Sequence, residues 1–287
     1  MASIQLVTEN LFRVSLSSAD LSTGDLSPQQ PEKIWQQIYQ EAQTAARDEP
    51  ILASFFQSTI LDHQSLGDAL SYHLANKLAS NAAPASMLRK LMDRAFSTDK
   101  ILQAVAADIQ ATVARDSACN LYLTPFLYFK GFLAVQSYRA AHQLWQEDRR
   151  SLALLLQYRI SLKFAVDIHP AAQIGSGLLV DHATGLVIGE TAVVEDCVSI
   201  MQSVTLGGTG KVSGDRHPKI RKGVLIGPGA KILGNIEVAE GAMVAASSVV
   251  LKPVPAHAIV AGVPAAVIGD ARSREPSQTM DHYFKCD

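Results

Sequence analysis

The sequence has few of the residues that build disulfides, metal sites and membrane spans. Its three cysteines, Cys119, Cys197 and Cys286, show no CxxC or other metal-ligand spacing, which favours a reducing compartment and gives no reason to expect a metal. The chain lacks a secretory signal and any apolar run long enough to span a bilayer. A formal net charge of −2 argues against nucleic acid as a partner. We therefore expect a soluble, cytoplasmic protein.

Glycine and aromatic residues are each scarce in one part of the chain. Only three of the 18 glycines precede Ile168, whereas only two of the 18 aromatic residues, Tyr283 and Phe284, follow it. Such a change of composition indicates two architectures in one chain. We expect a mobile arm at 1–26, an α-helical domain at 27–166, a second domain at 167–270 and a tail at 271–287 that is disordered from Arg272 onward.

The first part carries apolar residues at the spacing of amphipathic helices. Helical signals begin at Ser27 with Pro28, and an amphipathic run starts close to Pro31. Further helices are expected at Ile51–Leu61, Leu66–Leu78, Met87–Phe96, Ile101–Val113, Phe126–Trp145 and Ser151–Ala165. Thr124 followed by Pro125 predicts an N-cap and a first helical position, because a proline there loses no hydrogen bond.

The second part repeats an aliphatic residue every six positions. The series runs through Ile168, Ile174, Val180, Ile188, Val194, Ile200, Leu206, Ile220, Ile226, Ile232, Val238, Val244 and Val250. A period of six is neither helical nor alternating, and it is typical of a β-helix in which three short strands make one coil of about 18 residues. The chain is therefore expected to be α+β, an N-terminal α-helical domain followed by a left-handed parallel β-helix of hexapeptide repeats.

The repeat is broken at three places, and each break carries a histidine. They are the coil start at 167–170, the run 181–185 before a slip in phase, and an excursion at 207–218. Breaks in a repetitive core cost stability, so we expect function there. Asp167 and His182 are separated by slightly less than one regular coil and are expected to meet on neighbouring coils. A carboxylate beside an imidazole fixes its tautomer, which makes the pair a candidate general base.

These motifs resemble the catalytic domain of the serine acetyltransferases. The matching runs are DIHP at Asp167, DHATG at Asp181, SVTLGGTGK at Ser203, GDRHPKI at Gly214, GAKILGN at Gly229 and AGVPA at Ala261, with TPFLYFKGF at Thr124 and Arg115-Asp116 in the helical part. The resemblance implies transfer of acetyl from acetyl-CoA to the hydroxyl of L-serine, giving O-acetylserine for cysteine biosynthesis. It also implies direct attack with His182 as the general base, Asp167 as its orienting carboxylate and His217 as a second imidazole near the reacting group.

The same resemblance implies how the substrates are held. Arg216 would grip the serine carboxylate, a task that suits a guanidinium fork. Asp181 and Asp116, the latter from the helical domain, would pair with the serine ammonium. Gly207–Gly208 and Ala246 would line the CoA groove.

Two departures from the family pattern concern ligands and partners. After AGVPA, similar proteins carry basic residues for the CoA phosphates, whereas this chain has 266–270 without one, so Lys231, Lys252 or Arg272 would serve. Many relatives end in an isoleucine that enters O-acetylserine sulfhydrylase. This chain ends at Asp287, so we expect that complex to be weak or absent. The resemblance further implies feedback inhibition by L-cysteine at the serine site and a homotrimer or dimer of trimers.

Three other interpretations stay open. A hexapeptide acetyltransferase for another small acceptor shares the repeat but lacks the long helical part. A zinc carbonic anhydrase on the same prism needs three imidazoles on one metal, and His169, His182, His217 and His257 are available. A non-catalytic scaffold would not need the aspartate–histidine set.

Overall fold

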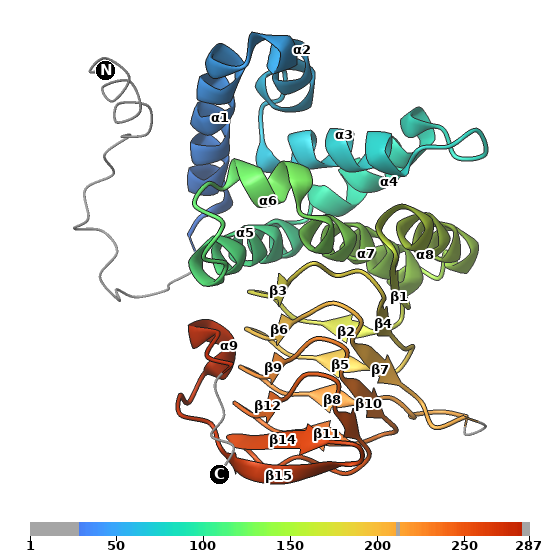
Figure 1. Ribbon diagram of the computed structural model, residues 1–287. Coiled ribbons are helices and arrows are strands. Elements are labelled where there is room, and N and C mark those ends of the chain that lie inside the picture. Colours follow the sequence, from blue (N-terminus) through green and yellow to red (C-terminus); the bar gives the residue numbers. More distant parts are fainter. Residues whose placement is uncertain (1–28, 211–212, 283–287) are drawn as a thin grey trace, which may run out of the picture.

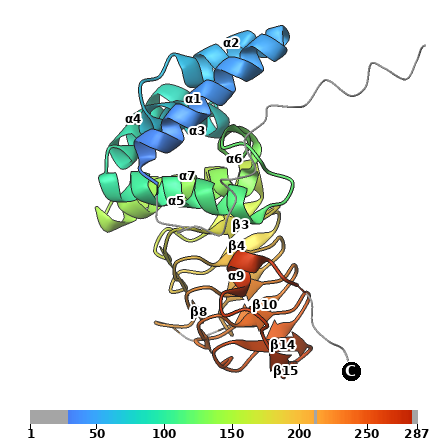
Figure 2. The same cartoon turned by 90° about the vertical axis from the view of Figure 1, so that its left-hand side faces the viewer.

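The computed structural model describes residues 29–210 and 213–282. The arm expected at 1–26, the aromatic pair Tyr283–Phe284 and the terminal Asp287 lie outside the described residues. A layer of helices sits across one end of a β-helical prism (Figures 1 and 2). Among the described helices, none has the length and apolar character that crossing a membrane requires.

The helical domain follows the periodicity of the sequence with two corrections. Its helices are α1 (Pro31–Asp48), α2 (Ala53–Phe56), α3 (Leu66–Leu78), α4 (Ala85–Phe96), α5 (Asp99–Arg115), α6 (Leu123–Tyr128), α7 (Lys130–Gln146) and α8 (Arg150–Phe164), with a 3₁₀ turn at Pro50–Leu52 and a π turn at Gln57–Leu61 flanking α2. The predicted cap at Thr124 is wrong, because α6 begins at Leu123 after Tyr122. The predicted helix from Phe126 is also broken at Phe129, where extended backbone ends α6 and caps α7. The break re-aims α7 so that Gly131 packs on the Val180 carbonyl of the prism.

The prism contains the predicted strands. All thirteen phased aliphatic residues lie in β1 (Val166–Ile168), β2 (Gln173–Ile174), β3 (Leu179–Val180), β4 (Leu186–Ile188), β5 (Val193–Val194), β6 (Ser199–Ile200), β7 (Thr205–Gly207), β8 (Lys219–Ile220), β9 (Leu225–Ile226), β10 (Lys231–Leu233), β11 (Glu237–Val238), β12 (Met243–Val244) and β13 (Val249–Val250). The strands stack into three parallel sheets. The first sheet is β1-β4-β7-β10-β13, the second is β2-β5-β8-β11, and the third is β3-β6-β9-β12. The third sheet is extended by β14 (Ala258–Gly262), which is parallel to β12, and by β15 (Ala265–Asp270), which is antiparallel to β14.

Two of the three breaks in the repeat lengthen a coil of the prism. The second coil, in which Val187 pairs with Thr205, has the regular length of three hexapeptides. The first coil is longer, because Val166 pairs with Leu186, and its insertion falls in the turn 181–185. The third coil is longer still, because Thr205 pairs with Lys231, and its insertion falls between β7 and β8, where residues 208–210 and 213–218 are described. Insertions are tolerated at these places because the turns lie outside the aliphatic core.

The tail beyond the prism is more ordered than the sequence predicts. A short helix, α9 (Pro276–Thr279), lies beside the third sheet (Figure 1). Ser277 is fully buried and donates to the Cys197 carbonyl at 2.5 Å, and Gln278 accepts from Arg115 Nε at 3.0 Å. The expectation of disorder from Arg272 onward is therefore wrong for this stretch, because its polar side chains bond to the prism and the helical domain.

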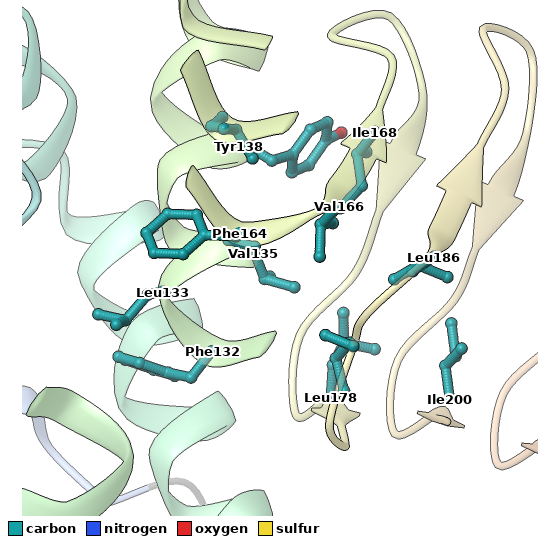
Figure 3. Packing of buried hydrophobic residues seen from close by; sticks show 14 of the residues in the cluster. Phe132, Leu133, Val135, Tyr138, Phe164, Val166, Ile168, Leu178, Leu186 and Ile200 are labelled. Atoms are coloured by element: carbon teal, nitrogen blue, oxygen red, sulfur yellow. The ribbon is translucent and has the colours of Figure 1, made fainter. Parts of the chain in front are cut away.

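The two domains share one hydrophobic core. Phe132, Val135 and Tyr138 of α7 face Val166 and Leu178 of the first coil (Figure 3).

A buried ion pair lies beside this shared core. Arg139 contacts Asp108 at 2.6 Å and donates to the Gly175 carbonyl at 2.7 Å, and Asp108 accepts from the Leu178 amide at 2.9 Å. Removing one partner would leave a buried charge unpaired, so the pair fixes the first coil against α5 and α7.

Candidate active site

The turn 181–185, at the edge where the third sheet passes into the first, carries His182. His182 and Ala183 both have positive φ, 54° and 61°, an arrangement that costs about 1–3 kcal/mol for each non-glycine residue. Neighbours hold the turn in place. The Gly185 amide donates to the Ala165 carbonyl at 2.7 Å, and the Thr184 carbonyl accepts from the Ser203 amide at 2.8 Å. In this turn, 72% of the His182 side chain is exposed.

The helical domain supports this turn from outside. The Lys130 ammonium, at the start of α7, donates to the Thr184 hydroxyl. Gly131 follows, and a Cβ at this position would overlap the Val180 carbonyl oxygen. The glycine is therefore required for α7 to approach the strand that leads into Asp181. We call the turns 181–185, 201–204, 227–230 and 245–248, which share this edge, the His182 corner.

Asp181 lies close to the His182 imidazole, whereas the described contacts of Asp167 are with other residues. Asp181 Oδ2 lies 3.6 Å from His182 Nε2, within ion-pair distance when the histidine is protonated. Asp167 accepts from Gln157 Nε2 at 2.7 Å, and its neighbour in the next coil is Val187. The spacing argument that placed Asp167 beside His182 does not hold, because the first coil is longer than the regular repeat. The pairing of Asp167 with His182 stays a prediction that depends on the resemblance.

The opposite edge of the first sheet carries His217 and Arg216. We call its described turns, 169–172, 189–192, 208–210, 213–218 and 234–236, the His217 corner. Arg216 donates to Glu190 Oε2 at 2.7 Å and to the Gly214 carbonyl at 3.0 Å. His217 is only 7% exposed and lies on Gly189, where a Cβ would overlap the ring. The guanidinium thus lies at this edge with a carboxylate already bound to it.

Thr191 ties this loop to the prism. Its hydroxyl oxygen accepts from the backbone amides of Arg216 and His217 at 3.0 and 3.1 Å and lies 2.9 Å from His217 Nδ1. Burial lowers the pKa of His217, and the Arg216 cation lowers it further. Burial also lowers the pKa of His169, whose ring meets the edge of Trp145 at 5.0 Å. Both imidazoles are therefore neutral near pH 7.

The remaining predicted residues divide between the two corners and the helical domain. Gly208 lies 3.5 Å from the Arg216 side chain, measured from an added Cβ, and Gly207 ends β7 on the same side. Ala246 belongs to the His182 corner and lines a cavity of about 290 Å³ with His282. Asp116 follows α5, and its carboxylate accepts from the Ala118 amide at 2.9 Å.

One strand of the first sheet separates the two corners. From Gly185 to Gly189 the chain crosses the sheet through β4, roughly 13 Å of extended backbone. A single chain therefore brings Arg216 and His217 together but leaves His182 across the sheet. Among the described residues, no group of three or more His, Cys, Asp or Glu side chains is placed to hold a metal.

A groove of about 1090 Å³ lies elsewhere, between α5, α7 and the first two coils. Its lining includes Lys100, His142, Ser176 and Asp196 and none of the predicted site residues. The chemistry that the sequence predicts needs an imidazole base beside groups for a carboxylate and an ammonium. The groove carries none of the residues that the resemblance assigns to these roles, whereas the corners of the first sheet carry His182, Asp181 and Arg216, so we place the candidate site at the corners.

Sequence reasoning missed Glu190, Thr191 and Lys130. Thr191 and His217 are separated by the same number of positions as Thr205 and Lys231, which is the length of the third coil. A count that included the inserted loop would have placed them side by side. No comparable signal in the sequence connects Lys130 with Thr184, since that contact depends on how α7 meets the prism.

Comparisons with known proteins agree with the two-part architecture. Residues 34–137 match the family described as serine acetyltransferase, N-terminal, and residues 217–252 match bacterial transferase hexapeptide repeats. A serine acetyltransferase of Salmonella typhimurium is 58% identical over 254 residues, which is 88% of this chain and 93% of that protein. A solved serine acetyltransferase in complex with cysteine has a TM-score of 0.87 at 57% identity, covering 89% of this chain and 100% of that one. The enzyme of Brucella abortus in complex with coenzyme A has a TM-score of 0.82 at 52% identity, covering 83% and 96%.

Proposed function

Since the chain belongs to the serine acetyltransferase family, we propose that it transfers the acetyl group of acetyl-CoA to L-serine, giving O-acetylserine and CoA. The observation that carries the proposal is the pair of corners on the first sheet, one with an exposed imidazole and one with a fixed guanidinium. Relatives solved with cysteine and with coenzyme A support both substrate classes. The free Cys119 and Cys197 are consistent with a reducing cytoplasm as the place of the reaction.

We assign the proton transfer to His182. The serine oxygen attacks the thioester carbonyl carbon while its proton passes to the imidazole. The tetrahedral oxyanion then collapses, the carbon–sulfur bond breaks, and the CoA thiolate takes the proton from the imidazolium. His182 suits this role because its ring is largely exposed and its nearest acidic neighbour is Asp181. A carboxylate at that distance stabilises the imidazolium intermediate.

The serine itself would be held by charge. Arg216 offers a planar fork of donors to the carboxylate, and Glu190 holds that fork in position until the substrate arrives. Asp181 and Asp116 are the proposed partners of the ammonium. L-Cysteine carries the same carboxylate and ammonium, so we propose that it inhibits by occupying the serine site, as the cysteine complex of a relative suggests.

We propose that the site is completed between copies of the chain, in a homotrimer that can pair into a hexamer. Serine carries its hydroxyl and carboxylate on adjacent carbons, so one molecule does not span the sheet between His182 and Arg216. A second copy packed on the first sheet would set its Arg216 corner beside this His182 corner. Val187 on that face is 36% exposed, and Leu154 and Tyr158 of α8, which lies above it, are 45% and 59% exposed. Such apolar exposure favours an interface.

Coenzyme A would lie along the same face. Gly207 and Gly208 admit close approach of a backbone-bound pantetheine arm, and Ala246 would line the groove beyond. Lys231, Lys252 and Arg272 are the candidates for a phosphate contact, and Lys231 donates to the Ser203 carbonyl at the His182 corner. The expected weakness of a complex with O-acetylserine sulfhydrylase rests on Asp287, which lies outside the described residues.

Release of free thiol from acetyl-CoA in the presence of L-serine tests the function. We expect release that depends on serine, falls with added L-cysteine and occurs in an assembly of three or six chains by sedimentation. Equal or faster release with an amino sugar in place of serine would support the acceptor alternative instead. An active, monodisperse monomer would contradict the shared site.

A further inference from the structure

The hydroxyl of Thr191 lies among four polar groups of the loop that carries His217, one of which is the Asp215 carboxylate. Its oxygen accepts from the backbone amides of Arg216 at 3.0 Å and of His217 at 3.1 Å. The same oxygen lies 2.9 Å from Nδ1 of the His217 ring. The backbone amide of Thr191 also points at that nitrogen, at 3.2 Å.

The backbone amide of Thr191 settles the role of the ring nitrogen. An amide can only donate, so His217 Nδ1 accepts from it. The lone pairs of the Thr191 hydroxyl are occupied by the amides of Arg216 and His217. Its one proton can go to His217 Nδ1 or to the carboxylate of Asp215, whose pKa a hydrogen bond with Thr191 lowers. A neutral imidazole that accepts at Nδ1 carries its proton on Nε2.

The surroundings keep this ring neutral. Burial lowers the pKa of His217, and the charges that face it are Arg216 and Lys219, which lower the pKa further, Glu190, which raises it, and His169, which lowers it. Protonation at Nδ1 would in addition break the bond from the Thr191 amide. Gly189 lets the ring lie flat on the end of β4, so its orientation is set on two sides.

We propose that Thr191 is a positioning residue that fixes His217 as the Nε2–H tautomer, so that His217 acts as a hydrogen-bond donor to the reacting acyl oxygen and not as a base. The inference rests on the proposed function for the identity of the acceptor. The tautomer itself follows from the contacts alone. In this proposal the two imidazoles have different roles, because His182 takes the proton from serine and His217 stabilises the oxyanion.

Nitrogen-15 spectra of the imidazoles test the tautomer without any substrate. Two-bond proton–nitrogen correlations distinguish the two neutral tautomers and the imidazolium, and the signal that disappears in His217→Gln identifies His217. We expect the Nε2–H pattern at pH 7 in the full-length protein and in Thr191→Ser. In Thr191→Val, which removes the hydroxyl at nearly constant shape, we expect a shifted or exchange-averaged pattern. An Nδ1–H or imidazolium pattern in the unaltered protein overturns the proposal, whatever the enzyme acetylates.

Kinetics test the donor role separately. His217→Leu should lower kcat by about 10²- to 10³-fold, the loss typical of removing one donor to an oxyanion. His217→Gln keeps an N–H donor on the side chain and should retain clearly more activity. A base cannot be replaced by an amide, so equal loss in the two variants, together with loss of the acid limb of the pH profile, would assign the base to His217 and refute the donor role.

Thr191 has a matched control on α1. Thr191→Val should lower kcat by roughly tenfold or more, with most activity restored in Thr191→Ser. Thr44→Val removes a similar hydroxyl, which donates to the Gln40 carbonyl at 3.2 Å on the exposed face of α1, and should change neither kcat nor the His217 spectrum. Wild-type kinetics in Thr191→Val with an unchanged spectrum would show that the hydroxyl does not position the ring.

Discussion

The two corners of the first sheet present a histidine in opposite ways. His182 stands on a turn with two consecutive left-handed residues, is largely exposed, and is supported from outside by α7. His217 is buried against the prism and is bonded from within by Thr191. A base must be able to gain and release a proton, which suits an exposed ring. A donor must be oriented before the reaction, which suits a ring with no freedom.

The two corners also differ in the parts of the molecule that hold them in place. The contacts of Arg216 and His217 at the His217 corner come from the prism, through Glu190 and Thr191. The His182 corner depends on the helical domain, through Lys130, Gly131 and the core between α7 and the first coil. The helical domain therefore supports the turn that carries His182.

Removing the exposed imidazole should give the largest effect. His182→Ala should lower kcat by about 10²- to 10⁴-fold, because the serine hydroxyl loses its proton acceptor, while the affinity for CoA is kept. Asp167→Asn should lower kcat less, since the imidazole remains. Steady-state thiol release and equilibrium CoA binding measure the two quantities. Near-normal turnover in His182→Ala would move the base to another residue.

Truncating the guanidinium should change binding more than turnover. Arg216→Ala should raise the KM for serine by roughly ten- to a hundredfold, the range expected for losing hydrogen bonds to a charged group. The same variant should lose inhibition by cysteine. Arg221→Ala is the control, because Arg221 pairs with Glu195 and Glu237 on the second sheet. Undiminished cysteine inhibition in Arg216→Ala would show that the inhibitor does not share the carboxylate site.

A methyl group inserted between α7 and the prism should affect the His182 corner more than the His217 corner. Gly131→Ala would push α7 away from the Val180 carbonyl, and overpacking of this kind costs about 1–3 kcal/mol. We expect a lower melting temperature and a severalfold lower kcat, with the KM for serine less affected because Arg216 lies on the other corner. Gly269→Ala, where an added Cβ meets nothing within 4 Å, is the matched control. A kcat that stays normal despite the lower melting temperature would show that the turn does not need α7.

The sequence contained the architecture of the prism but not the details of either corner. The six-residue period located β1 to β13 because each aliphatic residue points into one continuous core. The pairing of Asp167 with His182 was argued from a coil of regular length, although the slip in phase before Ile188 lengthens that coil. The contact of Thr191 with His217 spans a coil that contains an inserted loop, so the regular six-residue period does not predict it. The sequence of α9 consists of short polar residues without a helical period. Contacts across coils and domains leave no local pattern for periodicity to detect.

Mild acid should weaken the contacts of the helical domain that support the His182 corner, and this is the smallest effect at neutral pH. Burial lowers the pKa of His73 to about 4, and its Nε2 lies 3.2 Å from the Leu127 carbonyl of α6, next to the break that starts α7. The unfolded chain binds this proton near pH 6.5, so the contribution of His73 is complete above pH 6.5 and declines as the pH falls toward 4.

That decline is worth about 3 kcal/mol at most, the product of the pKa difference and about 1.36 kcal/mol per unit. The free energy of unfolding of the helical domain should therefore fall between pH 6.5 and 4, followed by helical circular dichroism during denaturation. His73→Gln keeps an N–H donor for Leu127 and should flatten the decline at some cost in packing against Phe126. His63→Gln is the control, since His63 bonds Asp68 near the surface. A pH profile identical in His73→Gln and the unaltered protein would show that the acid sensitivity arises elsewhere, and that the α6–α7 joint is not the acid-labile support of the His182 corner.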